Sequence, residues 1–542
     1  MRSRFPACPT GPYPSYVRSA DQTGALPGQE RATWRHPVAG HSFWRQVRVA
    51  AVRGPSTALL DEVVAGVEQA LCARGHEWTT TPDDRTDAFV TTARLHEPVS
   101  WRHSPLFTGR KRYGLTAKPA TYTFVQVREQ QLQDLVQRFE LALAKDPPDP
   151  ADFDLPGLST NAWQVLRDQG SRGGVMMCIG RLLQAQSKSL RVVMVVGERT
   201  AEAAYLFDLA GSYPRIDNDD MGGICGDLAL RIATHLSTRE VTAHRVDGEP
   251  IPPAQWQAST GRRAMLHVSR ELGARAFFTE MVRIADLVDV PALTGAVAQQ
   301  YSEGCFGTWD PVLQAQIVTV TGSRHPVVKA SLQEDDLAVI TGVLDCGSGA
   351  RVRTVAGLRN DPPSSEAVEF ASIDEYLPRR RPAASFGIDA EVPVVRSKLH
   401  GHRGVTAYDP DTVEYVPLDA PFFHYLVSCS TDAQAHGVTA AFARSRALRD
   451  PADPRTVVFT ILPGHGLLVA EKWVPGTQPF EVLLAAIDSG RLEISSRVPQ
   501  GSMHYVPVGD RMVLQLGGDG TESAAGPDTD LGSDDVREHE NG

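Results

Sequence analysis

Three short segments in the second half of the chain carry the side chains that most restrict its fold. Residues 360–366 read NDPPSSE, residues 399–404 read LHGHRG, and residues 463–466 read PGHG. They supply one carboxylate and three imidazoles, those of Glu366, His400, His402 and His465. Three imidazoles are a ligand set of catalytic zinc sites, which keep a further coordination position open. The chain is therefore expected to fold so that these distant segments meet.

The local sequence around each histidine favours such a site. One residue separates His400 from His402, and alternate side chains of a strand point to the same face. His465 stands between two glycines, which permit a tight turn, and it precedes the apolar run LLVA of a buried strand. An isolated HxH pair is commonly just two surface histidines. The third histidine and the nearby glutamate favour a site for Zn²⁺ or another divalent metal.

Composition indicates a soluble globular protein with no membrane span. The chain has 542 residues, of which 42% are hydrophobic and 22% charged. Its formal net charge of -11 argues against nucleic acid as a partner. The seven cysteines are scattered without a CxxC, and no apolar secretory segment opens the sequence. We therefore expect free thiols and a cytoplasmic location.

The order of periodic segments predicts an α/β fold with more than one domain. Residues 1–40 and the acidic residues 517–542 have compositions typical of disorder. Residues 41–250 are expected to form an α/β layered domain, although no motif in it indicates a role. The strands predicted there cover residues 47–52, 87–92, 122–127, 191–196 and 203–209. The predicted helices cover residues 57–74, 129–144 and 163–183.

Residues 265–490 carry several motifs in a fixed order. The motifs are a glycine-containing loop over residues 301–310 (YSEGCFGTWD), VTVTGS at 318–323, LQEDDLAVI at 332–340, PSSE at 363–366, the HGH segment at 400–402 and LPGHGLLV at 462–469. This order resembles the class II aldolase/adducin family. The resemblance implies that residues 260–505 form a class II aldolase-like α/β/α domain with a central, mainly antiparallel sheet.

The resemblance also implies roles for individual residues. His400, His402 and His465 would bind the metal, and Glu366 would be the general acid or base. Thr321, Gly322, Ser364 and Ser365, together with Gly304, would bind a phosphate. Turns rich in hydroxyl and N–H donors suit that task, although the same residue types are also ordinary in turns.

The chain departs from the family pattern at several positions. The family's Gly-Asn is Gly304-Cys305 here, which removes an amide donor. Arg403 follows the HxH pair where the family has serine, and we expect it to bind an anionic part of the substrate. The family's catalytic tyrosine, supplied by another subunit, has no assignable counterpart.

The resemblance implies a zinc-dependent lyase of class II aldolase type. Such an enzyme cleaves or forms a C–C bond in a phosphorylated sugar through a metal-stabilised enediolate. Glu366 would move the proton, with its pKa raised by a dry pocket. Because family members share sites between subunits, we expect a homo-oligomer such as a tetramer.

Three other functions fit the same motifs. A sugar-phosphate epimerase or decarboxylase could use the same fold and chemistry. A non-catalytic, adducin-like interaction module is the alternative from another class, although such members lack the ligand histidines. A ligand sensor with a vestigial metal site is the third.

Overall fold

A computed structural model of the whole chain describes the parts on which the following account rests. The described residues are 46–52, 54–94, 120–134, 137, 190–207, 220–237, 244–275, 277–278, 304–321, 327–344, 349–377, 379–380, 391–418, 432–462, 465–495 and 504–515. The two segments expected to be disordered and the helix expected over residues 163–183 lie outside this set.

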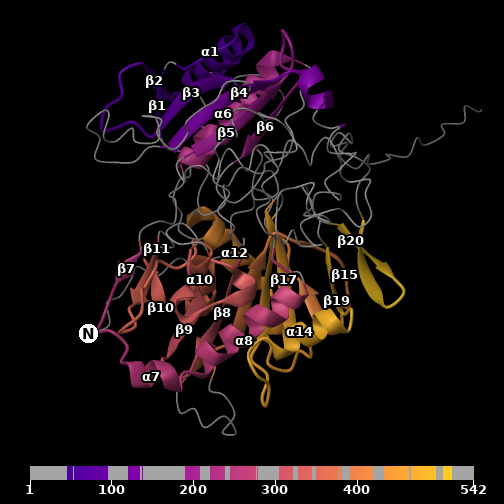
Figure 1. Cartoon of the computed structure of the whole chain (residues 1–542). Helices are drawn as coiled ribbons and strands as arrows, with labels where there is room; N and C mark the ends of the chain where they lie inside the picture. Colours follow the sequence, from indigo (N-terminus) through magenta and orange to yellow (C-terminus); the bar gives the residue numbers. More distant parts are fainter. Residues whose placement is uncertain are drawn as a thin grey trace, which may run out of the picture.

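The first half of the described chain forms a six-stranded sheet in the order β2-β1-β3-β4-β5-β6 (Figure 1). Its strands are β1 (Arg48–Ala51), β2 (Glu77–Thr79), β3 (Ala88–Arg94), β4 (Ala120–Val127), β5 (Leu190–Val196) and β6 (Ala203–Phe207). All neighbours are parallel except β6, which runs antiparallel to β5. The alternation of strands and helices in the sequence predicted this parallel arrangement.

Two helices pack on this sheet, α1 (Ala58–Ala73) and α6 (Met221–Ser237). The buried face of α1 carries the apolar residues whose helical spacing predicted it, and Thr57 caps its first turn by accepting from the N–H of Leu60. The sequence analysis did not predict α6, whose first turn holds two of the chain's glycines. Both helices share one hydrophobic cluster with the sheet.

The second half is built on a nine-stranded sheet in the order β16-β17-β18-β14-β8-β9-β10-β11-β7 (Figure 1). Its strands are β7 (Arg245–Val246), β8 (Cys305–Asp310), β9 (Ala315–Thr319), β10 (Leu337–Leu344), β11 (Gly349–Arg353), β14 (Val395–Gly401), β16 (Val413–Tyr415), β17 (Val457–Leu462) and β18 (Gly466–Lys472). Only the outermost pairs, β16 with β17 and β7 with β11, are parallel. The sheet is therefore mainly antiparallel.

Helices lie on both faces of this sheet. They are α7 (Pro253–Ala258), α8 (Thr260–Ala274), α10 (Ala367–Tyr376), α12 (Asp432–Arg444), α13 (Arg446–Arg449) and α14 (Glu481–Asp488), with short 3₁₀ turns η4 (Lys329–Ser331) and η5 (Glu334–Asp336). Lys398 of β14 pairs with Asp374 of α10, so His400, two residues along, also faces α10. On the opposite face, the ring of Phe306 meets that of Phe480 at the start of α14.

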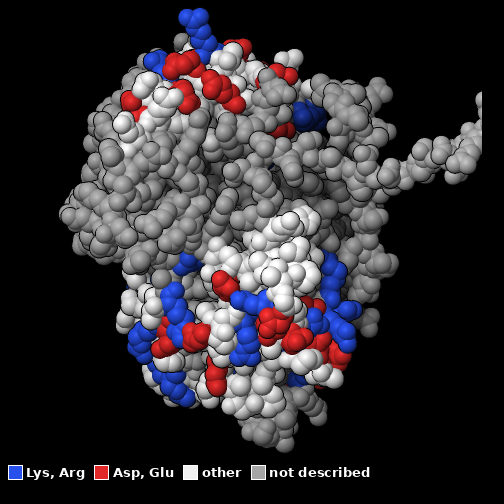
Figure 2. All heavy atoms as spheres, turned by 90° about the vertical axis from the view of Figure 1, so that its right-hand side faces the viewer, with Lys and Arg blue, Asp and Glu red and all other residues white. Residues whose placement is uncertain are grey.

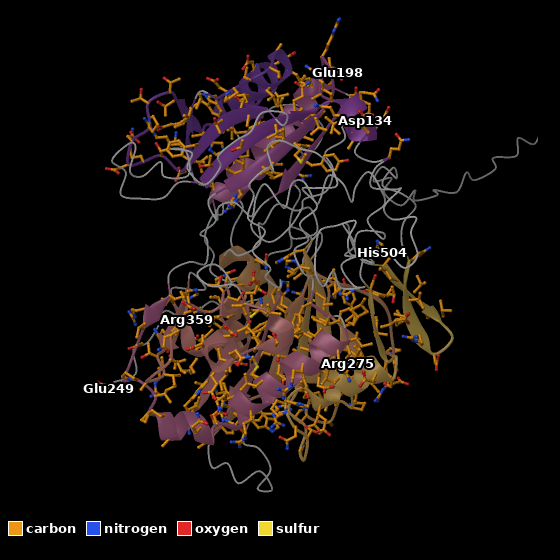
Figure 3. All side chains as sticks on the ribbon, in the orientation of Figure 1. Asp134, Glu198, Glu249, Arg275, Arg359 and His504 are labelled. Atoms are coloured by element: carbon orange, nitrogen blue, oxygen red, sulfur yellow. The ribbon has the colours of Figure 1, made fainter. Side chains whose placement is uncertain are left out.

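Smaller elements complete this half. A four-stranded sheet in the order β19-β15-β21-β20 and a β12-β13 pair add six strands: β12 (Arg379–Arg380), β13 (Val392–Pro393), β15 (Gly404–Tyr408), β19 (Leu492–Ser495), β20 (His504–Val508) and β21 (Arg511–Gln515). Arg275, which follows α8 and is labelled in Figure 3, makes a two-pronged ion pair with Asp488 of α14. Figure 2 shows acidic and basic side chains interleaved over the described part of one face.

The prediction of an α/β chain is confirmed, and one local prediction is wrong. Residues 305–310, which we expected in a loop, form β8 near the middle of the large sheet, and all six of its residues are buried. Its mixture of glycine, threonine and aspartate hid the strand. No helix in the described part of the chain has the length and apolar character needed to cross a membrane.

Candidate metal centre

The three predicted ligand histidines lie together at one end of the β14–β18 pair. His400 is the last residue but one of β14, His402 follows that strand, and His465 directly precedes β18. These strands are antiparallel, with Gly401 opposite Leu467, so the end of one lies beside the start of the other. His465 lies more than sixty positions after the other two histidines in the sequence, and the pairing of β14 with β18 brings it next to them.

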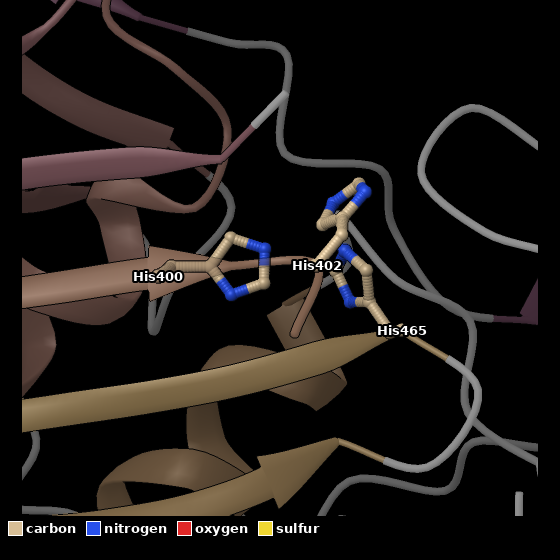
Figure 4. Close-up of side chains that lie close together, drawn as sticks. All are labelled: His400, His402 and His465. Carbon is tan, nitrogen blue, oxygen red and sulfur yellow. The ribbon is translucent and has the colours of Figure 1, made fainter. Parts of the chain in front are cut away.

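The three rings are close enough to share one ion (Figure 4). Ring centroids are 4.6 Å apart for His400 and His465, 4.9 Å for His402 and His465, and 5.4 Å for His400 and His402. Their ligand nitrogens all lie within 4.8 Å of one another. His400 and His465 are buried, and His402 is partly exposed.

Gly466 makes the close approach of these segments possible. A Cβ atom at this position would lie 2.1 Å from the carbonyl oxygen of Gly401 and 2.9 Å from Cα of His402. Any larger residue would push the start of β18 away from the end of β14. The glycine thus sets the distance between His465 and His402.

The hydrogen bonding of His400 suits a metal ligand. Its Nδ1 donates to the carbonyl oxygen of Leu467 at 3.0 Å, because a carbonyl oxygen can only accept. Within the described part of the chain, its buried Nε2 has no hydrogen-bond partner. Burial and the neighbouring His402 hold the pKa of His400 well below its ordinary value. The ring is therefore neutral at neutral pH, with its lone pair on Nε2, as metal binding requires.

Glu366 lies at the start of α10, on the same face of the sheet as His400. Ser364 donates to its Oε2 at 2.5 Å and Ser365 to its Oε1 at 3.0 Å. Burial raises its pKa, but His400, the Ser364 hydroxyl and His402 lower the pKa more, to well below the usual range. Our expectation of a raised pKa is therefore wrong, because imidazoles and hydroxyls surround the carboxylate. Glu366 is therefore ionised at neutral pH.

The residues predicted to bind phosphate are brought together in part. The N–H of Thr321 donates to Pro362 at 2.8 Å, and that of Ser364 donates to Thr319 at 3.1 Å, which joins the two turns. Gly322 lies outside the described residues. The hydroxyls of Ser364 and Ser365 donate to Glu366, and the N–H groups of Thr321 and Ser364 donate to the carbonyl oxygens of Pro362 and Thr319.

Gly304 and Arg403, the other two residues expected to bind an anion, both lie close to backbone carbonyl groups. Gly304, at φ 94°, lies against β14, where a Cβ would come within 2.7 Å of the His400 carbonyl oxygen. Arg403 is buried, and its Nε donates to the carbonyl oxygen of Phe277 at 3.3 Å, beyond the end of α8. That contact directs the guanidinium towards α8.

Two buried residues that the sequence analysis did not assign complete the surroundings. Cys305 lies directly opposite His400 in the β8–β14 ladder, and burial raises the pKa of its thiol to about 12. Lys329, on η4, is 4% exposed. Burial lowers the pKa of Lys329, whereas Cys305 and Glu366 raise it. No spacing rule marks a single buried lysine, so only the fold reveals it.

Comparisons with known proteins give this chain no relative. No family model matches it, and neither a curated protein nor a solved structure does. The chemistry of the site must therefore be argued from the side chains themselves.

Proposed function

We propose that this protein is a metal-dependent lyase of class II aldolase type that acts on a phosphorylated sugar. The observation that carries the proposal is the group of three histidines within 4.8 Å, placed beside an ionised glutamate. Three imidazoles, one of them on a partly exposed residue, suit a catalytic rather than a purely structural metal site. Zn²⁺ is the preferred candidate, and another divalent ion could occupy the same ligands.

Each residue has a definite task in this proposal. His400, His402 and His465 would hold the ion, and the Leu467 carbonyl would fix the tautomer of His400. Once bound, the ion supplies Lewis-acid stabilisation of negative charge on substrate oxygens. Glu366 would take the proton released when the bond breaks and return it in the reverse direction. Ser364 and Ser365 would hold that carboxylate in one orientation.

Metal analysis of the purified protein tests the first step. We expect wild type to bind a stoichiometric divalent ion, and His400→Ala, His402→Ala and His465→Ala to weaken zinc binding at least about 100-fold, since even residues behind the ligands cost up to that much. His267→Ala, at an exposed position on α8, is the matched control and should bind like wild type. Wild type that binds no divalent metal would refute the proposal.

A substrate screen tests the reaction. Sugar phosphates are incubated with the metal-loaded protein, and released dihydroxyacetone phosphate or aldehyde is measured. Glu366→Gln should retain the metal and lose at least about 100-fold in rate, the usual contribution of a positioned acid or base. An epimerised product or released CO₂ would instead assign the same proton transfer to an epimerase or a decarboxylase.

A further inference from the structure

Phe277 lies just beyond α8 and packs against the end of β14. Its N–H donates to the carbonyl oxygen of Leu272 at 3.0 Å, which ties the residue to the last turn of α8. Its ring centroid is 5.7 Å from that of Phe278, and Phe278 stacks in turn on Phe306 of β8 at 5.6 Å. The side chain is buried. The position of this ring is therefore fixed by contacts with a helix and with the sheet.

The ring of Phe277 occupies the space where a side chain of residue 401 would lie. A Cβ atom on Gly401 would come within 2.4 Å of its Cε1 atom and 2.7 Å of its Cζ atom. Because successive side chains of a strand point to opposite faces, the ring covers the face of β14 opposite to His400. A glycine between His400 and His402 is what leaves room for it.

Phe277 also contacts the residue on the other side of His402. The Nε of the buried Arg403 donates to the carbonyl oxygen of Phe277 at 3.3 Å. One residue thus contacts both sequence neighbours of His402, Gly401 through its ring and Arg403 through its carbonyl group. His402 itself lies in the two-residue link between β14 and β15, whereas His400 lies within β14. The place of such a link depends on the residues that pack against it.

We propose that Phe277 is a positioning residue of the candidate metal centre and holds His402 where its imidazole can share an ion with His400 and His465. This inference rests on the proposed function. The centroid of the His402 ring is 4.9 Å from that of His465. A shift of the link by about 1 Å would spoil a shared site, because metal–ligand distances tolerate only a few tenths of an ångström.

Zinc titration of two single variants and their double variant tests this role. Phe277→Leu removes Cε1 and Cζ and should weaken zinc binding roughly 10- to 100-fold, the usual effect of residues behind metal ligands. Gly401→Ala should weaken it by about the same factor, because the new methyl group overlaps the ring. In the double variant the methyl group can enter the space that Cε1 and Cζ have left. Phe277→Leu should therefore strengthen zinc binding at least about threefold in the Gly401→Ala background.

Phe459→Leu is the matched control. Phe459 is a fully buried phenylalanine of the same hydrophobic cluster, and its ring meets those of Tyr408, Tyr415 and Tyr505. This variant should lower the free energy of unfolding and leave zinc affinity unchanged. Visible absorption of the Co²⁺-loaded proteins gives a second readout, because its bands depend on ligand geometry. The bands should change in Phe277→Leu and match those of wild type in Phe459→Leu.

The outcomes separate this inference from the proposed function. Unchanged zinc affinity and unchanged Co²⁺ bands in Phe277→Leu would show that Phe277 supports only the fold. A double variant that binds zinc no more tightly than Gly401→Ala would also refute the inference, and both results leave the proposed function standing. Wild type that binds no zinc refutes the proposed function, and the inference falls with it. Should Phe277→Leu not fold, Phe277→Met replaces it, since its flexible side chain can also vacate the space of the ring.

Discussion

Two glutamates about one turn apart at the start of α10 have opposite preferences for a proton. Glu366 is ionised, whereas burial and then the charge of Glu366 raise the pKa of Glu369 to about 8. One oxygen of Glu369 accepts from Gln434 of α12, and the other has no hydrogen-bond partner in the described part of the chain. A buried carboxylate with an unsatisfied oxygen is costly, so Glu369 carries a proton at neutral pH.

This protonation makes stability depend on pH in a definite direction. Between its ordinary pKa of 4.5 and about 8, folded Glu369 keeps a proton that the unfolded chain has released. The free energy of unfolding therefore falls as pH rises through this window. Glu369→Gln, which imitates the protonated acid, should be more stable than wild type by about 3 kcal/mol at pH 7 and nearly equal to it at pH 4.5.

Chemical denaturation of both proteins across this pH range measures the difference. The comparison at pH 4.5 is the internal control, because Glu369 is protonated there in folded wild type and half protonated in the unfolded chain, which leaves a difference of less than about 1 kcal/mol. A difference that stays constant with pH would show that Glu369 does not titrate as stated.

Single residues show where sequence reasoning succeeds and where it stops. His400, His402 and His465 are recognisable because strand alternation and flanking glycines say where their side chains can point. Lys329 and Glu369 carry no such mark, because their burial depends on η4 meeting α8 and on α12 covering α10. Arg403 was noticed through its neighbours in sequence, yet its contact at Phe277 is set by the fold.

At the scale of elements, the pairing of β14 with β18 forms the metal centre. The start of β18 can lie against the end of β14 only because residue 466 lacks a side chain. Gly466→Ala should therefore separate the strands at this end, weaken zinc binding at least about tenfold and lower the free energy of unfolding by about 1–3 kcal/mol, as overpacking does.

A second glycine of the same sheet provides the control for this change. Gly342 lies in β10, and a Cβ there would meet nothing closer than 3.7 Å. Gly342→Ala should leave zinc affinity unchanged, as measured by titration beside Gly466→Ala. Equal zinc affinity in the two variants would contradict the role given to Gly466.

Helices and strands whose sequences show a regular pattern of apolar residues were predicted well, and those without such a pattern were not. The apolar spacing of α1, the aromatic and β-branched residues of β4 and the apolar run of β5 reflect burial that their own side chains favour. In β8, glycine and polar residues are buried because strands β14 and β9 flank it and helices α8 and α10 pack against it. Such burial is imposed by tertiary structure and leaves no period in the segment itself.

At the scale of the whole molecule, the two sheets have separate hydrophobic clusters among the residues that the structure describes. One contains buried residues between Val47 and Leu236, and the other contains residues between Ile251 and Leu492. The second cluster begins before residue 260, where we expected the second domain to start. Strand β7 pairs with β11, and the fully buried Ile251 bridges to Val355. The sequence around Ile251 resembles a linker because its prolines and glycine hide this contact.

Separate clusters predict that the second half folds and binds metal without the first. A shortened chain of residues 240–542 should unfold cooperatively and bind zinc with the stoichiometry of the full chain. A chain of residues 256–542 lacks β7 and Ile251 and should be less stable by at least about 2 kcal/mol, the contribution of one buried aliphatic side chain. Denaturation and zinc titration of the three proteins measure both effects. If residues 240–542 do not fold while the full chain does, the second cluster depends on the first half. If the two shortened chains are equally stable, β7 and Ile251 do not contribute to the stability of the second half.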